Sequence, residues 1–543
     1  MKALQNQKLW PIYLLIIAIF AYWPVLGSLS PINPDAQYIF PVLLETQNLF
    51  DYFDKLLSYQ TLDFQPVRDL SFYVDILFYK NFLINSSIYQ NIIFWVMGCL
   101  VLGRIIKKVV PTLKDVEIFF IIVAFLVYPL FSQAVSWGVA RKHILAFLFI
   151  LIATNAWISK EDGKNGKSAI YSSVFYLLSV LSQPITLLWP VWAIAYDFLS
   201  LRSHRIKRGL FLIPAFAILL TVTYFNFQYY QTSPLFAKLY GTKTDELFEI
   251  SDKVLALGHY LYQMTAPYLL SYSYTLGHWS TLAGLGVLGI LSLLLIKFNS
   301  GIRYISIWAL YSLLPLAVVI SKSRTLYDTY LLVPTVGLLF LLLGIKEKLP
   351  SIPSLKLFFY GGMIIVWFGL TNYESSGWMN EVELTKRSFE RRPSCLTSFQ
   401  YLRMSYENNS LPTSPDAKRY LYNYKCEAFE MSGDSLLNLQ TYLLYYEEDF
   451  TPEVRINKLS MMAQRGFLPG ITLIAIYLKF EKFPEADKAI EEFIQTRGNI
   501  RYRNEYIPIV NHVVYPYCFQ KHNVRCTAML KPFIIQPNSI LYK

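Results

Sequence analysis

Long apolar runs recur through the first two thirds of the chain and then stop. Runs of about 16–22 residues follow one another between residues 10 and 371, and nothing comparable occurs between 372 and 543. A helix needs about 20 mostly apolar residues to cross the hydrocarbon core of a bilayer. The pattern therefore predicts an all-α membrane protein with a transmembrane domain over 1–371 and a soluble helical domain over 372–543.

We expect roughly eleven transmembrane helices. They are predicted at 10–27, 87–105, 117–135, 143–158, 169–182, 185–200, 209–229, 280–296, 304–320, 328–344 and 356–371. The segment 253–275 is also apolar, but His259, Gln263 and Pro267 interrupt it, so we interpret it as interfacial or re-entrant. Composition agrees with a membrane protein, because 16% of the 543 residues are charged, against about 25% in globular chains.

Basic residues gather in alternate loops, which predicts the orientation of the chain in the membrane. Short loops rich in lysine and arginine stay in the cytoplasm. The N-terminus is then cytoplasmic, and 28–86, 136–142, 230–279, 321–327 and 372–543 lie outside. The net charge of +12 flanks the predicted spans instead of lining one soluble face, which argues against a nucleic-acid partner. The first run carries no small-residue cleavage site, so we expect it to remain as an anchor.

Cysteine placement fits this topology. Cys99 lies within a predicted span, whereas Cys395, Cys426, Cys518 and Cys526 all fall in the domain assigned to the outside. An even number in an oxidising compartment predicts two disulfides, and proximity favours pairing Cys395 with Cys426 and Cys518 with Cys526 over the other two pairings. Zinc is less favoured because these cysteines form no CxxC pair, and no other pattern predicts a metal site.

The soluble domain contains one clear helical hairpin, ITLIAIYLKFEKFPEADKAIEEFIQTRG. Tyr477, Ala486 and Ile490 stand at the spacing at which tetratricopeptide helices bring large and small residues into mutual contact. A generic helical hairpin with an apolar stripe explains the same pattern. Either way, the domain is a candidate surface for protein partners.

Residues 28–86 are too long for a connector and too apolar for a disordered loop. Ile39, Phe40, Leu43 and Leu44 recur at near-helical spacing, which predicts amphipathic helices along the outer membrane surface over a cavity between spans. Asp35 stands just beyond the first span, where a carboxylate can face a substrate that enters from the lipid. It also fits a helix N-cap after the Asn33-Pro34 turn.

Five blocks of sequence resemble a known family. FQPVRDLSFYVDILFY, FLVYPLFSQAVSWGVARKHILAFLF, LLSVLSQPITLLWPVWAIAYDFL, YLYQMTAPYLLSYSY and DTYLLVPTVGLLFLL occur in this order between residues 64 and 345. They resemble, in sequence and order, segments of the transmembrane and tetratricopeptide-repeat O-mannosyltransferase family and its bacterial relatives. The family carries the second block as HPxxxExVxWxxxRxxLLxxLF and the last as ERYLYLPSLGLALLL.

The resemblance implies a GT-C fold, in which a multi-span enzyme takes a sugar from a polyprenyl-phosphate carrier and passes it to an acceptor on the outer side. An acidic residue of the first outer loop serves there as general base, and Asp35 matches it. The leaving phosphate needs cations, which Arg68, Arg141, Lys142 and Arg324 could supply from the outer loops, although each fits an interfacial anchor equally well. Short loops favour a bacterial inner membrane.

This chain departs from the family at several motif positions. The acidic pair is reduced to Asp35, and the family's Glu, Lys and Arg are replaced at Gln133, Gln183 and Thr329. Asp328 stands where the family has the Glu of ERY, and Arg324, four residues before it, would replace the missing arginine if that loop is helical.

Two functions therefore stay open. The first is a glycosyltransferase acting on Ser or Thr of exported protein, on a glycan or on a lipid. The second is a GT-C-derived scaffold that has lost catalysis and holds partners in an envelope complex. A transporter is favoured least, because we find no inverted repeat and few charges inside the spans.

The topology makes a testable prediction. Cys395, Cys426, Cys518 and Cys526 should be oxidised and should react with a membrane-impermeant maleimide only after reduction, from the outside. Protease should likewise reach 372–543 from the outside only. Labelling of all four thiols without reductant, or cleavage from the cytoplasmic side alone, would overturn the assignment.

Overall fold

The computed structural model describes most of the predicted bundle and part of the C-terminal domain. The described residues are 6–27, 48–61, 63–82, 87–158, 165–200, 212–233, 250–265, 328–348, 353–391, 395–407, 451–463, 467–496 and 514–521, with the isolated positions 42–43, 45–46, 270, 286, 393, 417 and 526–527. Every regular element among them is helical, which confirms the all-α class. The chain divides into two compact units, Met1–Arg392 and Pro393–Lys543.

Nine of the predicted spans coincide with helices of the first unit. These elements are η1 (Gln7–Leu9), α2 (Trp10–Ala21), η2 (Trp23–Gly27), α6 (Ser87–Val109), α7 (Asp115–Leu126), η3 (Pro129–Phe131), α8 (Ser132–Ser136), η4 (Gly138–Ala140), α9 (Arg141–Ile158), α10 (Asn165–Ser182), η5 (Pro184–Thr186), α11 (Trp189–Ser200), α13 (Ile213–Thr232), η6 (Asp328–Leu331), α19 (Leu332–Lys348) and α20 (Pro353–Gly377). The other two predicted spans, 280–296 and 304–320, lie outside the described residues except for the isolated position 286.

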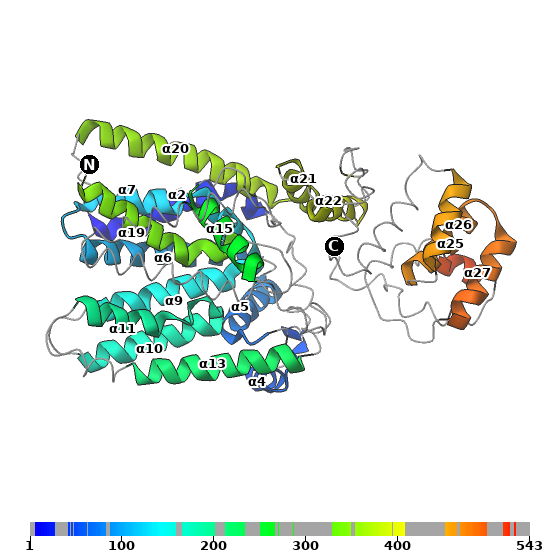
Figure 1. The fold of residues 1–543 in the computed structure, drawn as a ribbon, viewed down its shortest axis with the longest axis horizontal. Coiled ribbons are helices and arrows are strands. Elements are labelled where there is room, and N and C mark those ends of the chain that lie inside the picture. Colours follow the sequence, from blue (N-terminus) through cyan, green and yellow to red (C-terminus); the bar gives the residue numbers. More distant parts are fainter. Residues whose placement is uncertain are drawn as a thin grey trace. The chain divides into compact units, whose positions relative to one another are not determined.

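The long helices lie side by side as a bundle (Figure 1). Helices α6 and α9 form its centre, and Trp95 of α6 is fully buried there. The Trp95 ring packs against Phe125, Phe131 and Phe147 at centroid distances of 5.7, 5.0 and 5.2 Å. Its indole N–H donates to the carbonyl of Leu126 at 3.1 Å, so the polar atom of this large apolar side chain is satisfied.

Close helix packing in this core depends on small residues. A Cβ added at Gly98 of α6 would lie 2.8 Å from Cε1 of Phe147, whose ring is fully buried.

Helix α20 is joined to the rest of the bundle by hydrogen bonds from its polar side chains. Thr371 donates to the carbonyl of Val127 at 2.8 Å, and Asn372 donates to that of Phe20 at 3.1 Å.

Few of the described helices are both long enough and apolar enough for a full membrane crossing. Gly138–Ile158 is long and apolar enough, and Asp115–Leu126 with Pro129–Ser136, bent by 48°, makes a second if the pair forms one broken span. Gln7–Ala21, Ser168–Ser182, Pro184–Tyr196 and Asp328–Gly344 are apolar but shorter. A straight crossing of about 30 Å needs about 20 helical residues, which these segments do not reach.

Four further helices belong to the first unit. Two lie in the predicted first outer loop: α4 (Leu49–Leu57) and α5 (Pro66–Phe82). The segment that we interpreted as interfacial or re-entrant contains α15 (Ile250–Thr265), and α21 (Glu381–Arg391) follows the last bundle helix. Asn48 caps α4 by accepting hydrogen bonds from the N–H groups of Phe50 and Asp51.

The second unit contains α22 (Cys395–Glu407), α25 (Pro452–Ala463), α26 (Phe467–Lys479), α27 (Phe483–Thr496) and α29 (Tyr515–Gln520). The predicted hairpin is the α26–α27 pair, in which Ala486 and Ile490 are buried. Its turn is tight: Glu481 has a φ of 57°, and the Lys482 N–H donates to the Tyr477 carbonyl at 2.9 Å. The predicted Cys518–Cys526 disulfide is confirmed, whereas Cys426 lies outside the described residues.

The packing of α6 leads to a stability prediction. Gly98→Ala forces a methyl group against the buried ring of Phe147, and overpacking of this kind costs roughly 1–3 kcal/mol. We therefore expect a lower midpoint of thermal unfolding in detergent, measured by circular dichroism. Gly369→Ala is the matched control, because nothing lies within 4 Å of the added Cβ on α20. An unchanged midpoint for Gly98→Ala would contradict the packing.

Candidate functional site

The five sequence blocks that resemble the glycosyltransferase family meet at one end of the bundle. Gln65 of the first block donates to Gln183 of the third at 2.8 Å. The second block contacts the remaining two: the Tyr128 hydroxyl donates to the carbonyl of Met264 at 2.7 Å, and Gln133 accepts from the N–H of Thr329 at 3.3 Å. Segments as far apart as residues 65 and 329 thus build one polar region.

Arg68 of α5 lies at the centre of a buried network in this region. Its guanidinium is fully buried, with Nη2 2.6 Å from Asp63 and 2.7 Å from Asp69. Nη1 donates to Gln65 at 3.0 Å, and the Tyr52 hydroxyl donates to the other oxygen of Asp69, also at 3.0 Å. The guanidinium is enclosed by these partners, so it joins Gln65 and Asp69 of α5 to Asp63, which precedes that helix.

The charges of this network are set by burial and by close pairing. Burial lowers the pKa of the Arg68 guanidinium, but Asp63 and Asp69 outweigh it, so the pKa is raised above its ordinary value. Burial also raises the pKa of the Asp69 carboxyl, and Arg68 opposes that effect. Arg68 therefore stays cationic at every physiological pH.

A second buried arginine joins α5, α6 and α9. Arg141 Nη2 lies 2.5 Å from Asp75 of α5, and Nε donates to Asn91 of α6 at 2.9 Å. Nη1 and Nη2 also donate to the carbonyls of Ser71 and Ser87, at 3.1 and 2.9 Å. Arg141 is fully buried, and its contacts anchor α5 to α6 and α9.

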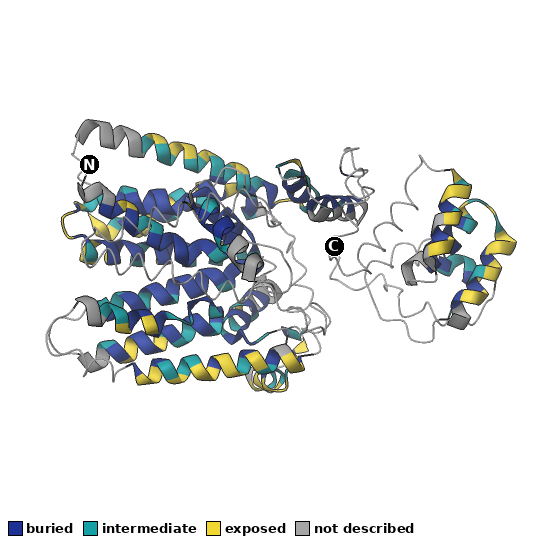
Figure 2. Cartoon of the chain, in the orientation of Figure 1, coloured by how far each residue is buried: buried dark blue, intermediate teal, exposed yellow. Residues whose placement is uncertain are grey.

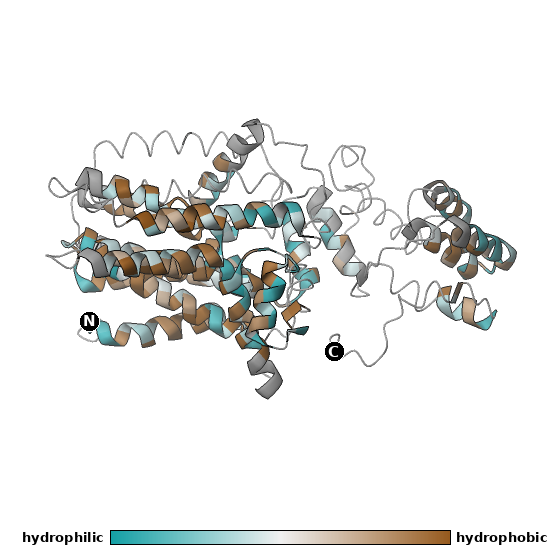
Figure 3. Ribbon diagram, turned by 90° about the horizontal axis from the view of Figure 1, so that it is seen from below, coloured by the Kyte–Doolittle hydropathy of each residue, from teal (hydrophilic) through white to brown (hydrophobic). Residues whose placement is uncertain are grey.

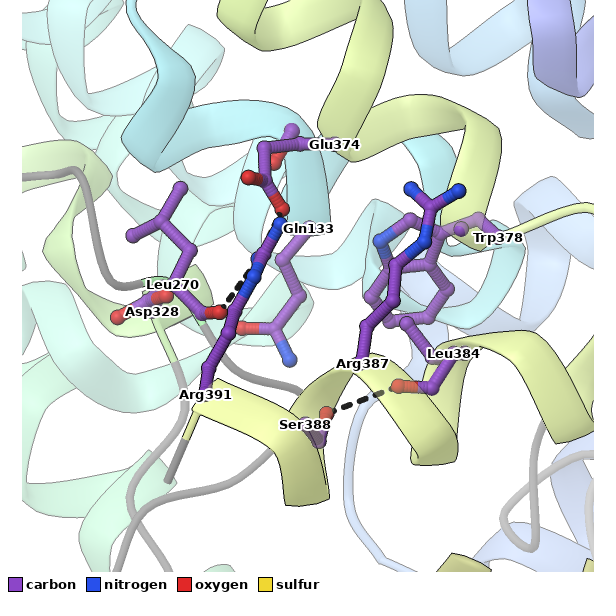
Figure 4. Close-up of a pocket in the computed structure, with 11 residues that line it drawn as sticks. Gln133, Leu270, Asp328, Glu374, Trp378, Leu384, Arg387, Ser388 and Arg391 are labelled. Carbon is purple, nitrogen blue, oxygen red and sulfur yellow. Dashed lines mark hydrogen bonds and ion pairs between the residues drawn. The ribbon is translucent and has the colours of Figure 1, made fainter. Parts of the chain in front are cut away.

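A small pocket lies at this end of the bundle. It lies between the end of the bundle, where α8 and η6 meet, and the pair formed by the end of α20 and α21 (Figure 4). Its lining residues are Ser132, Gln133, Leu270, Asp328, Glu374, Gly377, Trp378, Leu384, Arg387, Ser388 and Arg391. Both Gln133 and Asp328 come from motif positions at which the chain departs from the family.

Charged groups of opposite sign face one another in the pocket. Arg391 Nη1 donates to Glu374 and to the carbonyl of Leu270, both at 2.7 Å (Figure 4). Burial lowers the pKa of Arg391, but Glu374 and Tyr373 outweigh it, so the pKa is raised above its ordinary value. Arg387 donates to Glu383 at 2.7 Å and to the carbonyl of Tyr373 at 2.8 Å. Asp328 is 1% exposed.

The residues predicted from sequence are distributed unevenly over this region. Asp328 lines the pocket, Arg68 and Arg141 lie in the buried networks, and Lys142 is half-buried next to Arg141. Asp35 and Arg324 lie outside the described residues, so their roles stay predictions. Within the parts of the chain that the structure describes, no group of three or more His, Cys, Asp or Glu side chains is placed to hold a metal ion.

Sequence reasoning missed Glu374, Trp378, Arg387 and Arg391. They lie beyond residue 345, where the family resemblance ends, and the chain from 372 onward had been assigned to a separate soluble domain. One signal was present: Glu383 and Arg387 stand four residues apart in a charged stretch that follows the last predicted span.

Comparison with known protein families, characterised proteins and solved structures gives no match for this chain.

The Arg141 network leads to a second stability prediction. Arg141→Ala removes the cation from Asp75, a carboxylate that is 7% exposed, and breaking a buried ion pair costs about 3–5 kcal/mol. We expect a large fall in the midpoint of thermal unfolding in detergent. Lys386→Ala is the control, because Lys386 makes only a solvent-exposed pair with Glu390 at 3.9 Å. Equal effects of the two substitutions would show that the Arg141 pair is dispensable.

Proposed function

We propose that this protein is a polytopic membrane glycosyltransferase of the GT-C type. It transfers a sugar from a polyprenyl-phosphate carrier to an acceptor on the outer side of the membrane: Ser or Thr of exported protein, a glycan or a lipid. The observation that carries the proposal is the meeting of all five family-like blocks in one polar region beside a pocket. Segments that resemble an enzyme's motifs and converge in space are expected when those motifs build one site.

Membrane insertion with about eleven spans is part of this proposal. It is supported by large apolar residues that are exposed on the bundle helices. Figure 2 colours the ribbon by burial, and Figure 3 colours it by hydropathy. Ile12, Ile16 and Phe20 form a stripe on α2 with exposed fractions of 55, 46 and 58%, and α13 exposes Leu220 and Phe227 in the same way. A helix that meets water carries polar residues on that face, whereas lipid favours the residues found here.

The two ends of the bundle differ as the proposed topology requires. One end holds the Arg68 and Arg141 networks and the pocket, which lie in segments assigned to the outside or at the adjoining ends of predicted spans. At the other end, Lys107 pairs with Asp115 at 2.9 Å, and Lys108 donates to Asn155 at 2.6 Å. These lysines belong to a basic loop that the positive-inside rule assigns to the cytoplasm.

The proposed reaction is a displacement at the anomeric carbon with inversion. Asp35 takes the proton of the acceptor hydroxyl as its oxygen bonds to the anomeric carbon, and the bond from that carbon to the phosphate oxygen breaks. Polyprenyl phosphate leaves with the electron pair, and Lys142 and Arg324 are the candidates to neutralise it. The buried Arg68 and Arg141 position the first outer segment that carries Asp35.

The C-terminal unit lies in the bacterial periplasm in this proposal. The Cys518–Cys526 disulfide supports that location, because such bonds persist in oxidising compartments. The α26–α27 hairpin, which is tetratricopeptide-like in spacing, then offers a surface to exported proteins or to partners in an envelope complex.

A catalytically inactive scaffold is the second candidate. It is favoured by the two amides at motif positions, because Gln133 and Gln183 stand where the family has an acid and a lysine, and both are engaged in hydrogen bonds within the protein. Neither amide can act as a base or neutralise a phosphate.

The central prediction concerns Asp35. Asp35→Asn keeps the shape of the side chain but removes the proton acceptor, so sugar transfer should fall by roughly 10²–10⁴-fold. The measurement is transfer of a labelled sugar from its polyprenyl phosphate to acceptors in membranes that contain the full chain. Arg324→Ala should weaken transfer partly through donor affinity.

Asp54→Asn is the matched control, because Asp54 is an exposed carboxylate on α4 in the same outer segment. It should leave transfer unchanged. If Asp35→Asn has no effect, while deletion of 393–543 abolishes the cellular phenotype, the chain acts as a scaffold and the enzyme proposal is wrong.

A further inference from the structure

We infer that helix α4 docks on the outer leaflet of the membrane through Phe50, Phe53 and Leu57, which we call the α4 stripe. The partner of this surface is phospholipid. The inference rests on the membrane insertion in the proposed function, but it does not rest on catalysis. All residues of the argument belong to the first unit.

The α4 stripe consists of large apolar side chains that the folded chain leaves open. Phe50 is 87% exposed, Leu57 is 60% exposed and Phe53 is 42% exposed. At about 100° per residue, the three side chains fall within a sector of about 60° on one side of the helix. Single exposed apolar residues are ordinary on a protein surface, whereas three on one face of a short helix indicate a surface that binds a partner.

The other two sides of α4 have different surroundings. Tyr52 and Leu56 are each 2% exposed and pack in one cluster with Tyr229 of α13. The third side is polar and consists of Asp51, Asp54, Lys55 and Ser58. The helix therefore presents one side to protein, one side to water and the α4 stripe to a third environment. A helix that lies in the membrane interface beside a bundle has this arrangement, and its third environment is lipid.

The α4 stripe lies next to a helix whose own exposed face is apolar. The Tyr229 hydroxyl of α13 donates to the carbonyl of Leu56, and the ring of Tyr59 packs on that of Tyr229 at a centroid distance of 4.9 Å. Figure 1 shows α4 beside this end of α13, and Figure 2 shows exposed residues on both helices. The exposed residues of α13 share one face and are 55–69% exposed: Ile213, Leu220, Tyr224 and Phe227. Lipid that covers this face of α13 therefore reaches the level of α4.

Lipid fits the α4 stripe better than a folded partner does. A standard protein interface buries about 800 Å² on each side, and three side chains of this size and exposure offer at most about half of that area. The polar side of α4 offers no net positive charge to anionic headgroups, because Lys55 pairs with Asp51 at 3.7 Å and Asp54 is exposed. Docking therefore depends on apolar burial, and the charge of the phospholipid headgroup should matter little.

Docking of α4 also sets the depth of the Arg68 network. The Tyr52 hydroxyl donates to Asp69 at 3.0 Å, and Asp69 lies 2.7 Å from Nη2 of Arg68. Tyr52 belongs to the protein side of α4, and the α4 stripe belongs to the same helix. The lipid contact and the buried network are thus joined through one element, which holds the outer segment at the membrane surface.

The test measures the surroundings of two sides of α4 by electron paramagnetic resonance. Phe50→Cys, Phe53→Cys and Leu57→Cys report on the α4 stripe, and Asp54→Cys reports on the polar side. Each full chain carries a nitroxide label and is reconstituted in vesicles of phosphatidylcholine and phosphatidylglycerol. Oxygen concentrates in lipid, whereas a nickel chelate stays in water. The oxygen-to-nickel accessibility ratio should be at least about threefold higher on the α4 stripe than at Asp54→Cys, because an interfacial helix buries its apolar face about 5–10 Å deep.

The controls separate lipid from water and from protein. The parent chain, labelled in the same way, gives the background of the native cysteines, and vesicles of phosphatidylcholine alone should give the same ratios. Nickel access to the α4 stripe equal to that at Asp54→Cys would place the stripe in water and overturn the inference. Exclusion of both reagents would also overturn it, because protein would then cover the stripe, and magnetic broadening between labels would identify that protein as a second copy. Size-exclusion profiles identify variants that are not folded, and the remaining stripe positions then decide.

Leu220→Cys on α13 separates this inference from the proposed function. If its label lies in lipid while the α4 stripe lies in water, the inference fails and membrane insertion stands. If its label is also open to the nickel chelate, membrane insertion fails, and the proposed function fails with it. A lipid-bound α4 stripe in a chain whose sugar transfer is unchanged by Asp35→Asn would uphold the inference and reject the enzyme.

Discussion

The burial of two guanidinium groups at one end of the helical bundle is the constraint on which this structure depends. Removing an arginine from water costs several kcal/mol unless carboxylates and hydrogen bonds replace the lost hydration. Arg68 and Arg141 meet this demand with Asp63, Asp69 and Asp75, all drawn from the first outer segment. The pairing therefore fixes α5 against α6 and α9 and ties the chemistry of the outer segment to the bundle.

This constraint explains why the candidate site lies where it does. The core of the bundle is mostly apolar, and the buried arginine networks lie at one end of it. Figure 3 shows brown apolar stretches along the long helices. The short elements η3, α8 and η6 end or begin the long helices there, and their backbone bends bring Gln133 beside Thr329. The pocket forms where α20 and α21 cover that junction. Its polar lining is thus a consequence of helix ends meeting, and its charge balance follows from the need to neutralise buried ions.

The same balance bears on the choice between enzyme and scaffold. Arginines that are saturated by protein carboxylates stabilise a framework, whereas a site for a leaving phosphate needs cations that remain available. In the proposed enzyme Lys142 and Arg324 are the candidates for these cations.

The sequence by itself determined the helical class, the position of nine helices and the Cys518–Cys526 disulfide, because apolar runs and short cysteine spacings are local signals. It also located Asp328 through a motif. It did not find the roles of Glu374, Trp378, Arg387 and Arg391, since nothing local relates α20 and α21 to residues 132–133 or 328. Nor did it show that Arg68 and Arg141 are enclosed by carboxylates. Only the tertiary structure decided these points, because burial and the pairing of charges depend on which distant segments pack together.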